Sequence, residues 1–272
     1  MGSRRGVWRV HAILLTGALL MFAPFVWQVV VSLQTLTESL RTPPTFTPSW
    51  QWSNYADAFR TVPLGRQFLN TVLVTVAVTA GQLLFCSLAA FAFARLRFPG
   101  RDALFMVFLA VLMVPSELFL LPRYEIMQGL GWLDSLQALI APGVFGAFGV
   151  FLLRQFFLTL PGELDEAARL DGANPFQIFW HVMLPLIRPG LLALGLLTVL
   201  WSWSSLLWPL VVNTDPEMMT LSAGLASLRG QFQTDFPVLF AGSAVASLPI
   251  IVLFVVMQRQ LIAGIAFTGS KG

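Results

Sequence analysis

The sequence predicts an all-α polytopic membrane protein with six transmembrane helices. Of its 272 residues, 57% are hydrophobic and 11% are charged, whereas a soluble globular domain carries about 25% charged residues. The shortage of charge extends along the whole chain, so lipid must be the solvent for most of it. Six separate apolar stretches are each long enough to cross a hydrocarbon core, which takes about 20 helical residues.

The predicted spans are 12–33, 68–94, 103–122, 137–159, 190–212 and 239–258. Backbone groups in lipid must be hydrogen-bonded within the segment, which favours helices, and these stretches lack the alternation of barrel strands. Small residues predict close helix packing, namely Ala77 and Gly81 on the second span and Gly143, Gly146 and Gly149 on the fourth. We favour packing within the chain, and a subunit interface is the alternative.

The distribution of basic residues orients the chain. An even number of spans puts both termini on one side, and the positive-inside rule favours the cytoplasm for the side richer in basic residues. With cytoplasmic termini that side holds eleven basic residues and the outer side five. The first apolar run is too long for a signal peptide and no cleavage site is evident, so we expect it to be retained. We therefore expect a multi-pass protein of a bacterial or archaeal cytoplasmic (inner) membrane.

The cytoplasmic loop 159–189, between spans four and five, carries most of the acidic residues of that side. Its punctuation predicts two short helices. The first would begin at Pro161, reach about Leu170 and close at Gly172 in a left-handed cap. Asn174 is a good N-cap for the second helix, which would run toward Leu184 and stop before the following proline.

The first of these helices presents a small apolar face formed by Leu164, Ala167 and Ala168, with charged residues around it. An amphipathic helix lying on the membrane is one interpretation, but such anchors are rich in basic and bulky apolar residues. This helix is acidic and carries alanines. We favour docking to another protein, in which flanking charges fix the register.

The same loop resembles the EAA loop of ABC importer permeases, whose pattern reads E-A-A, three residues, G, nine residues, I, any residue, L-P. The run begins at Glu166, and only Val182 departs from the pattern, where isoleucine is usual. In that family the loop forms a coupling helix that sits in a cleft of a separate cytoplasmic ATPase. The resemblance therefore implies a role in ATPase coupling for Glu166, Ala167, Ala168, Asp171, Gly172, Leu184 and Pro185.

The resemblance covers nearly the whole chain and is greatest to the maltose-type carbohydrate branch. Residues 89–100 are similar to that branch's exit from the second span, and 151–157 to the end of its fourth. The tail 264–272 is similar to its C-terminal signature, which would make Lys271 a contact with the ATPase. The alternative for Lys271 is a frayed terminus.

Five residues are candidates for the translocation pathway. The family commonly has Trp-Asn, an acid and aromatics at the position of Trp203, Ser204, Ser205 and Trp208, and here serines replace the amide and the carboxylate. Aromatic faces can stack on sugar rings, but Trp208 could equally belong to an interfacial belt. Glu117 is the one acid within a span, and it either faces a cavity or snorkels to the interface.

The chain is not expected to be an enzyme or to bind a cofactor. It has no G-x-x-x-x-G-K-[ST] loop, so ATP and Mg would be bound by a partner ATPase. One cysteine and two histidines predict no metal site. The implied partners are two ATPase copies, a second permease subunit forming a heterodimer and an extracytoplasmic binding protein, for which the segment 34–67 is a candidate surface. No nucleic acid is expected.

The expected function is uptake of a sugar or related polar solute by alternating access driven by the ATPase. Glycerol-3-phosphate or another non-sugar solute is the alternative within the same class. An ion-coupled secondary transporter would place ionisable residues near the bilayer midplane, often with internal repeats. Only Glu117 comes close to that position, and no clear repeat is seen. A membrane-embedded enzyme is the other rival, and the two histidines are too far apart in the sequence to suggest a paired site.

Overall fold

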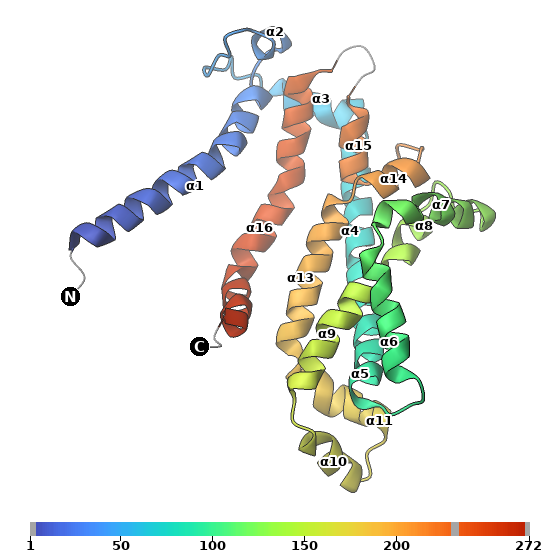
Figure 1. The fold of residues 1–272 in the computed structure, drawn as a ribbon. Coiled ribbons are helices and arrows are strands. Elements are labelled where there is room, and N and C mark those ends of the chain that lie inside the picture. Colours follow the sequence, from blue (N-terminus) through green and yellow to red (C-terminus); the bar gives the residue numbers. More distant parts are fainter. Residues whose placement is uncertain (1–3, 230–233, 270–272) are drawn as a thin grey trace. The chain divides into compact units, whose positions relative to one another are not determined.

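The computed structural model describes residues 4–229 and 234–269, and within these ranges the regular secondary structure is helical, with no strand (Figure 1). The prediction of an all-α fold is confirmed for this part. The chain divides into two compact units, residues 1–65 with 224–249 and residues 66–223 with 250–272. Each unit is described by itself.

The first unit contains α1 (Arg4–Ser32), α2 (Leu36–Ser39), α3 (Ser53–Thr61) and the first part of α16 (Phe236–Gly269). Polar side chains fold the segment after α1 back onto its end. The Asn54 amide donates to the carbonyls of Ser32 and Gln34, both at 2.9 Å, and the Tyr55 hydroxyl lies 2.9 Å from Ser32 Oγ. The segment after α1, which was predicted as a binding-protein surface, is therefore an ordered cap on this helix end.

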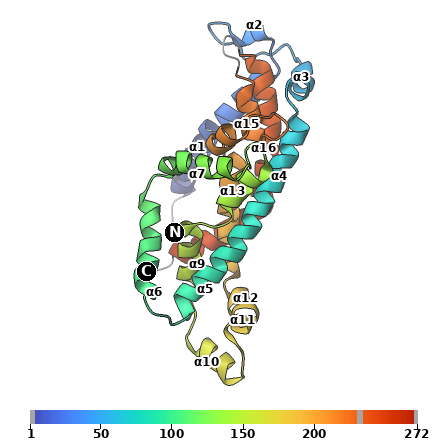
Figure 2. The same ribbon diagram turned by 90° about the vertical axis from the view of Figure 1, so that its right-hand side faces the viewer.

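The second unit is built around one long helical rod, Leu64–Arg95 (Figure 2). It consists of α4 (Leu64–Gly81), a π-helical turn η1 (Gln82–Cys86) and α5 (Ser87–Arg95). A π turn is one residue wider than an α turn and often marks a functional position. The rod corresponds to the second predicted span.

The fourth predicted span packs closely against this rod. It comprises α8 (Leu136–Ile140), η4 (Ala141–Gly143) and α9 (Ala147–Thr159). A Cβ on Gly81 would lie 2.6 Å from that of Val144, and one on Gly149 would lie 2.8 Å from Cys86 Sγ. Since real Cβ atoms do not approach so closely, the glycines permit the contact. The predicted packing within the chain is confirmed for Gly81, Gly143, Gly146 and Gly149.

The third predicted span is not one continuous helix, and this corrects the prediction of a single run over 103–122. The chain forms α6 (Arg101–Ala110), η2 (Val111–Met113), η3 (Ser116–Phe119) and α7 (Leu120–Gly129), with a bend of 97° between the two halves. Pro115 is the cause. It disfavours helical backbone at the residue before it, and Val114 is extended with φ −91° and ψ 124°.

The loop between the fourth and fifth predicted spans contains two short helical stretches, residues 163–170 and 175–186. Its elements are α10 (Glu163–Leu170), α11 (Pro175–Gln177), the π turn η5 (Ile178–Met183) and α12 (Leu184–Leu186), followed by α13 (Arg188–Ser204) and α14 (Leu207–Val212). Gly172 is left-handed with φ +83°, and Asn174 caps α11 by accepting from the Gln177 N–H. Both features agree with the sequence prediction.

Two boundaries in this region differ from the prediction. The first helix begins at Glu163 rather than Pro161, with Gly162 as its N-cap. The second helix does not stop before Pro185 but continues to Leu186, then turns by 78° into α13. The π turn before α12 shifts the hydrogen-bonding pattern, which places Pro185 in a first turn, where its missing N–H costs little.

The predicted fifth span, 190–212, is also interrupted. Helix α13 ends at Ser204, Ser205 is extended with φ −62° and ψ 126°, and α14 restarts at Leu207. Within the described residues, four helices are long and apolar enough to cross a membrane, and two bent pairs would raise that number to six. The sixth prediction corresponds to the Phe236–Val256 part of α16.

Polar side chains on α4 hold the segment that follows α14. Gln67 Nε2 donates to the Pro216 carbonyl at 3.1 Å, and Asn70 Nδ2 donates to the carbonyls of Glu217 and Met219 at 2.8 and 3.0 Å. The Leu221 N–H donates to the Thr71 hydroxyl at 2.8 Å. These side chains lie in an apolar helix because they satisfy the carbonyls of an irregular segment.

A carboxylate ties the loop between α7 and α8 to the same segment. Asp134 accepts from the N–H of Asp215 at 2.8 Å and from the N–H and hydroxyl of Thr214. These donors favour the charged form, and the Asp215 N–H foremost among them lowers the pKa of Asp134. We call this arrangement the Asp134 clasp.

Replacing Gly81 by alanine should destabilise the chain even though alanine is the better helix former. The new methyl would overlap Val144, and overpacking of this kind costs about 1–3 kcal/mol. Gly17→Ala is the matched control because nothing lies within 4 Å of its Cβ position in α1. Thermal melting in detergent should show a lower Tm for Gly81→Ala only. An unchanged Tm would contradict the packing described.

The Asp134 clasp should stabilise the chain in a pH-dependent way. A folded-state pKa below the unfolded value, about 3.9, gives stability that is present above that value and lost as the pH falls through the folded pKa. Asp134→Asn should therefore lower the Tm at pH 7, and the difference from wild type should shrink below about pH 3.9. The exposed pair of Asp57 with Arg60 supplies a control, Asp57→Asn, for which little change is expected. A difference that is constant with pH would exclude the charge as the cause.

Candidate functional site

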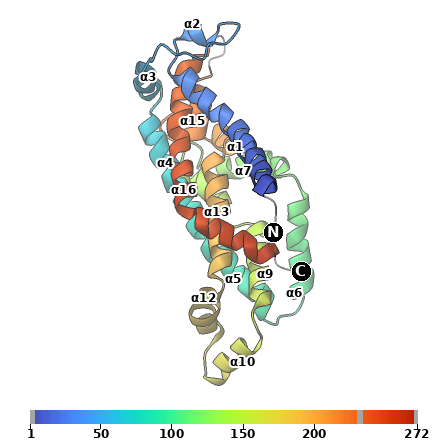
Figure 3. The same ribbon diagram turned by 90° about the vertical axis from the view of Figure 1, so that its left-hand side faces the viewer.

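Helix α10 lies at one end of the second unit, beyond the ends of α5 and α9 (Figures 1 and 3). Glu166, Ala167, Asp171 and Gly172 are exposed on it or directly after it. Leu170 is 89% exposed, which is unusual for an apolar side chain on a short charged helix. This exposed set is a surface of mixed apolar and acidic character.

The inner side of α10 packs on the buried core of the same unit. Leu164 and Ala168 contact a cluster that includes Phe157, Phe179 and Met183. The predicted apolar face is therefore split, since Leu164 and Ala168 point inward while Ala167 is exposed beside Leu170. Helical periodicity groups these residues, but the contact with the chain's own core decides which of them remain accessible.

The remaining predicted coupling residues belong to the same packed loop. Leu184 is half-buried against the core cluster and Pro185 is exposed on α12. The Ala173 N–H donates to the Ala168 carbonyl at 2.9 Å, which turns the chain from α10 toward α11. The loop is therefore a single folded piece.

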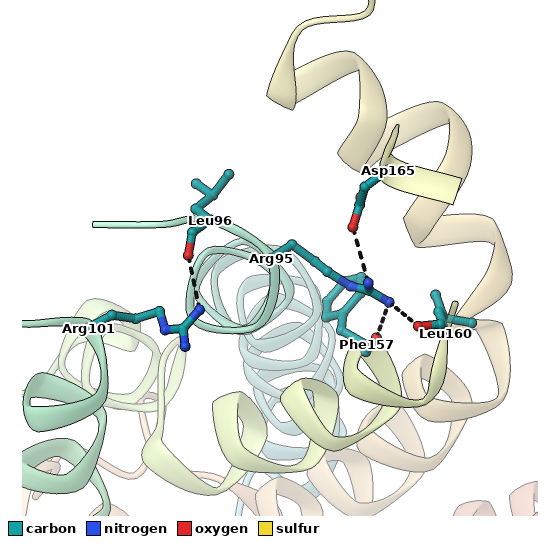
Figure 4. Close-up of polar contacts among 6 residues, drawn as sticks. All are labelled: Arg95, Leu96, Arg101, Phe157, Leu160 and Asp165. Carbon is teal, nitrogen blue, oxygen red and sulfur yellow. Dashed lines mark hydrogen bonds and ion pairs between the residues drawn. The ribbon is translucent and has the colours of Figure 1, made fainter. Parts of the chain in front are cut away.

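Arg95, the last residue of α5, joins this piece to two helices (Figure 4). Its guanidinium donates to Asp165 Oδ2 at 3.1 Å and to the carbonyls of Phe157 and Leu160, both at 2.6 Å. The side chains of Arg95 and Asp165 are only 10% and 13% exposed. One cation therefore caps the end of α9 and holds α10 against α5.

Nothing in the sequence indicates this pair beyond the two charges themselves. Arg95 is one of the eleven basic residues on the predicted cytoplasmic side, and Asp165 is one of four acidic residues in the loop 159–189. They are 70 residues apart. Arg95 and Asp165 come together because α5 and α9 pack against each other and end side by side.

A cavity of about 400 Å³ lies inside the second unit where several helices are interrupted, a volume typical of small-molecule sites. Its wall includes the π turn η1, the break between α8 and α9, and the end of α13 with the start of α14. The lining residues that carry polar or aromatic groups are Gln82, Arg123, Phe148, Thr198, Trp201, Ser202, Ser205, Trp208 and Thr220.

Two of the five predicted pathway residues, Ser205 and Trp208, line this cavity. The others lie elsewhere. The Trp203 ring packs edge-on against Phe68 with centroids 5.7 Å apart, Ser204 is exposed, and Glu117 is exposed beside the Ser116 hydroxyl. Lys271 lies outside the described residues.

Sequence reasoning missed several residues of the cavity. Gln82, Arg123 and Thr220 line it but are not among the predicted pathway residues. An amide within a charge-free apolar run, as at Gln82, was the available signal. In the described part of the chain no group of three or more histidine, cysteine or acidic residues is placed to hold a metal.

Residues 82–266 match the family of binding-protein-dependent transport system inner membrane components. An arabinooligosaccharides transport system permease protein of Halalkalibacterium halodurans is 40% identical over 205 residues, 75% of this chain and 74% of that protein. A diacetylchitobiose uptake system permease protein of Streptomyces coelicolor is 32% identical, and the match covers 94% of this chain and 86% of that protein. An sn-glycerol-3-phosphate transport system permease protein of Rhizobium meliloti is 33% identical and covers 95% of each chain.

The fold is that of a solved transporter chain as well. A chain from the crystal structure of a bacterial ABC transporter involved in alginate import superposes with a TM-score of 0.82 at 24% identity, covering 95% of this chain and 98% of that one. The family match spans most of the sequence, and relatives above 30% identity cover nearly all of it. This chain therefore belongs to the binding-protein-dependent transport system inner membrane components, the permease subunits of ABC importers.

Proposed function

We propose that this permease moves a sugar or a related polyhydroxylated solute across the cytoplasmic membrane by alternating access. The similar permeases named above serve arabinooligosaccharides, diacetylchitobiose and glycerol-3-phosphate. Sugars are the first candidate. A polyol phosphate is the second, because the glycerol-3-phosphate relative matches the chain over 95% of both lengths.

The observation that carries the proposal is the exposed surface of α10 together with its attachment through Arg95. Glu166, Ala167 and Leu170 are accessible to a partner, while Asp165 on the opposite side of the helix is tied to α5. If α10 docked in an ATPase cleft through its exposed residues, a movement of the cleft would be transmitted to the spans through Asp165. We assign Glu166, Ala167, Asp171 and Gly172 to docking, and Ala168, Leu184 and Pro185 to the support of the docked helix.

In the proposed assembly this chain has six spans, with both termini and α10 in the cytoplasm. Its partners are a second permease subunit, two ATPase copies and an extracytoplasmic binding protein. ATP and Mg are bound by the ATPase, and this chain is non-catalytic. Lys271 is assigned to a contact with the ATPase. The ordered cap after α1, with Trp50 and Trp52 exposed, is the surface proposed for the binding protein.

Coupling in this assembly is a difference in docking free energy. ATP closes the ATPase dimer, α10 moves with its cleft, and the spans joined to α10 rotate to open the cavity outward. A ligand or partner shifts a conformational equilibrium only by as much as its affinities for the two states differ. Docking through few residues at a surface attached rigidly to the spans transmits that difference.

Reversing the charge at Glu166 should weaken the binding of the ATPase and so reduce uptake. Tagged chain purified from native membranes in mild detergent should bring down a P-loop ATPase, and Glu166→Lys should reduce that recovery at least about tenfold, since a mismatched charge in an interface costs several kcal/mol. Glu125→Lys, on the exposed side of α7, is the control and should retain the ATPase. Wild-type recovery and uptake with Glu166→Lys would rule out docking through α10.

The Arg95–Asp165 pair should be energetically coupled. Removing one member of a buried pair costs about 3–5 kcal/mol because it leaves the other charge unpaired. Asp165→Leu and Arg95→Leu should each lower the Tm in detergent, and the double variant should lose less than the two losses combined. The exposed pair Arg60 and Asp57, 80% and 44% exposed, is the matched control with a coupling of at most about 1 kcal/mol. Additive losses for Arg95 and Asp165 would contradict the link.

A further inference from the structure

Arg123 brings an uncommitted positive charge to the cavity of the second unit. It is half-buried, lines the cavity from α7, and its Cζ lies 5.3 Å from the centroid of the Trp208 ring. Among the described residues it forms neither an ion pair nor a hydrogen bond. The ring face offsets part of the cost of removing the cation from water, but the N–H donors of the guanidinium have no acceptor.

The N-terminus of α9 adds further donors to the same cavity. Its N-cap, Gly146, provides no side-chain acceptor, and Ala147, Phe148 and Gly149 all line the cavity. No acceptor within the described residues takes the N–H groups of these three. The first N–H groups of a helix and the positive end of its dipole favour an anion.

Thr220 is an independent indication that a ligand belongs in this cavity. It lines the cavity and is 3% exposed, yet its hydroxyl has no hydrogen-bond partner among the described residues. Buried hydroxyls are normally paired. No acidic side chain of the described residues lines the cavity, and Arg123 is the one charged side chain on its wall.

Two indole rings supply the remaining wall. Trp201 packs edge-on against Phe148 with centroids 5.1 Å apart, and Trp208 is fixed by donating from Nε1 to the Ala138 carbonyl at 3.0 Å. Both rings are held in place by the chain. A fixed aromatic surface suits the apolar face of a sugar ring or polyol chain.

We propose that this cavity is a solute subsite for an anionic polyhydroxylated compound, whose carboxylate or phosphate is bound by Arg123 and the N-terminus of α9. The carbon skeleton lies against Trp201 and Trp208, and Thr220 donates to or accepts from the solute. The inference rests on the proposed importer function and narrows its solute class. It also means that this subunit contacts the solute itself.

The test uses the complete transporter, co-purified with its partner subunits and binding protein and reconstituted in liposomes with ATP inside. Matched pairs of neutral and anionic probes are offered, galactose with galacturonate and glycerol with glycerol-3-phosphate, and inorganic phosphate is offered alone. We expect ATP-dependent uptake of an anionic member in preference to its neutral partner. Uptake of the uronate or of the phosphate ester identifies which anion is used, and uptake of inorganic phosphate alone would overturn the polyol part of the proposal.

Variants of Arg123 connect that preference to the cavity. Arg123→Gln should reduce uptake of the anionic probe about tenfold or more, the loss expected for a hydrogen bond to a charged group, while Arg123→Lys should retain part of it because the charge remains. Arg97→Gln, at an exposed position outside the cavity, is the control. Recovery of the complex should be the same for all three variants, and Arg97→Gln should take up the anionic probe at the wild-type rate.

Protection of the wild-type complex against thermal unfolding gives a readout that needs no variant to fold. The anionic probes should raise its Tm and the neutral ones should not. ATP-dependent uptake of a neutral sugar that is unaffected by Arg123→Gln would overturn this inference and leave the importer function standing. Absence of ATP-dependent uptake for every solute that the binding protein retains would overturn both.

Discussion

The close packing of the rod Leu64–Arg95 against α9 is the contact on which the rest of the second unit depends. Inside lipid there is little hydrophobic force between helices, so association requires close backbone approach. Glycines at 81 and 149 provide it, because a Cβ at either would overlap the facing helix. That contact sets the position of η1 beside the break before α9, and hence the cavity. It also brings the ends of α5 and α9 level.

Arg95 converts this packing into a connection with the surface. The C-terminal end of a helix leaves carbonyl groups unpaired. Arg95 donates hydrogen bonds to the carbonyls of Phe157 and Leu160 at the end of α9, and it also binds Asp165. One side chain thus satisfies the end of one helix and anchors another. The pair is nearly buried, so water weakens it less than it would an exposed pair. Helix α10 is consequently held by its inner side while Glu166 and Leu170 stay accessible.

Local rules were enough to predict the parts of this structure that local chemistry determines. Gly172 and Asn174 occur where the left-handed cap and the N-cap were expected, and the apolar runs correspond to helices. The breaks at Pro115 and after Ser204 were missed because a count of apolar residues does not register a bend. The contact of Arg95 with Asp165 could not be predicted, because the two residues are 70 positions apart. The contact of Arg123 with Trp208 could not be predicted either, because the directions of α7 and α14 depend on the breaks before them. Periodicity grouped Leu164 with Ala167, but only tertiary contact separates them.

The π turn η1 has a consequence for direction within the rod. Each residue of an α-helix advances the side chains by about 100° around the axis, and a π turn inserts one extra residue. The face of α4 that carries Gln67, Asn70 and Thr71 toward the segment after α14 is therefore out of angular phase with the face of α5 that ends at Arg95. A straight α-helix of the same length would aim Arg95 about 100° away from its present direction relative to α4. The π turn therefore lets the two ends of one rod make their contacts in different directions around its axis.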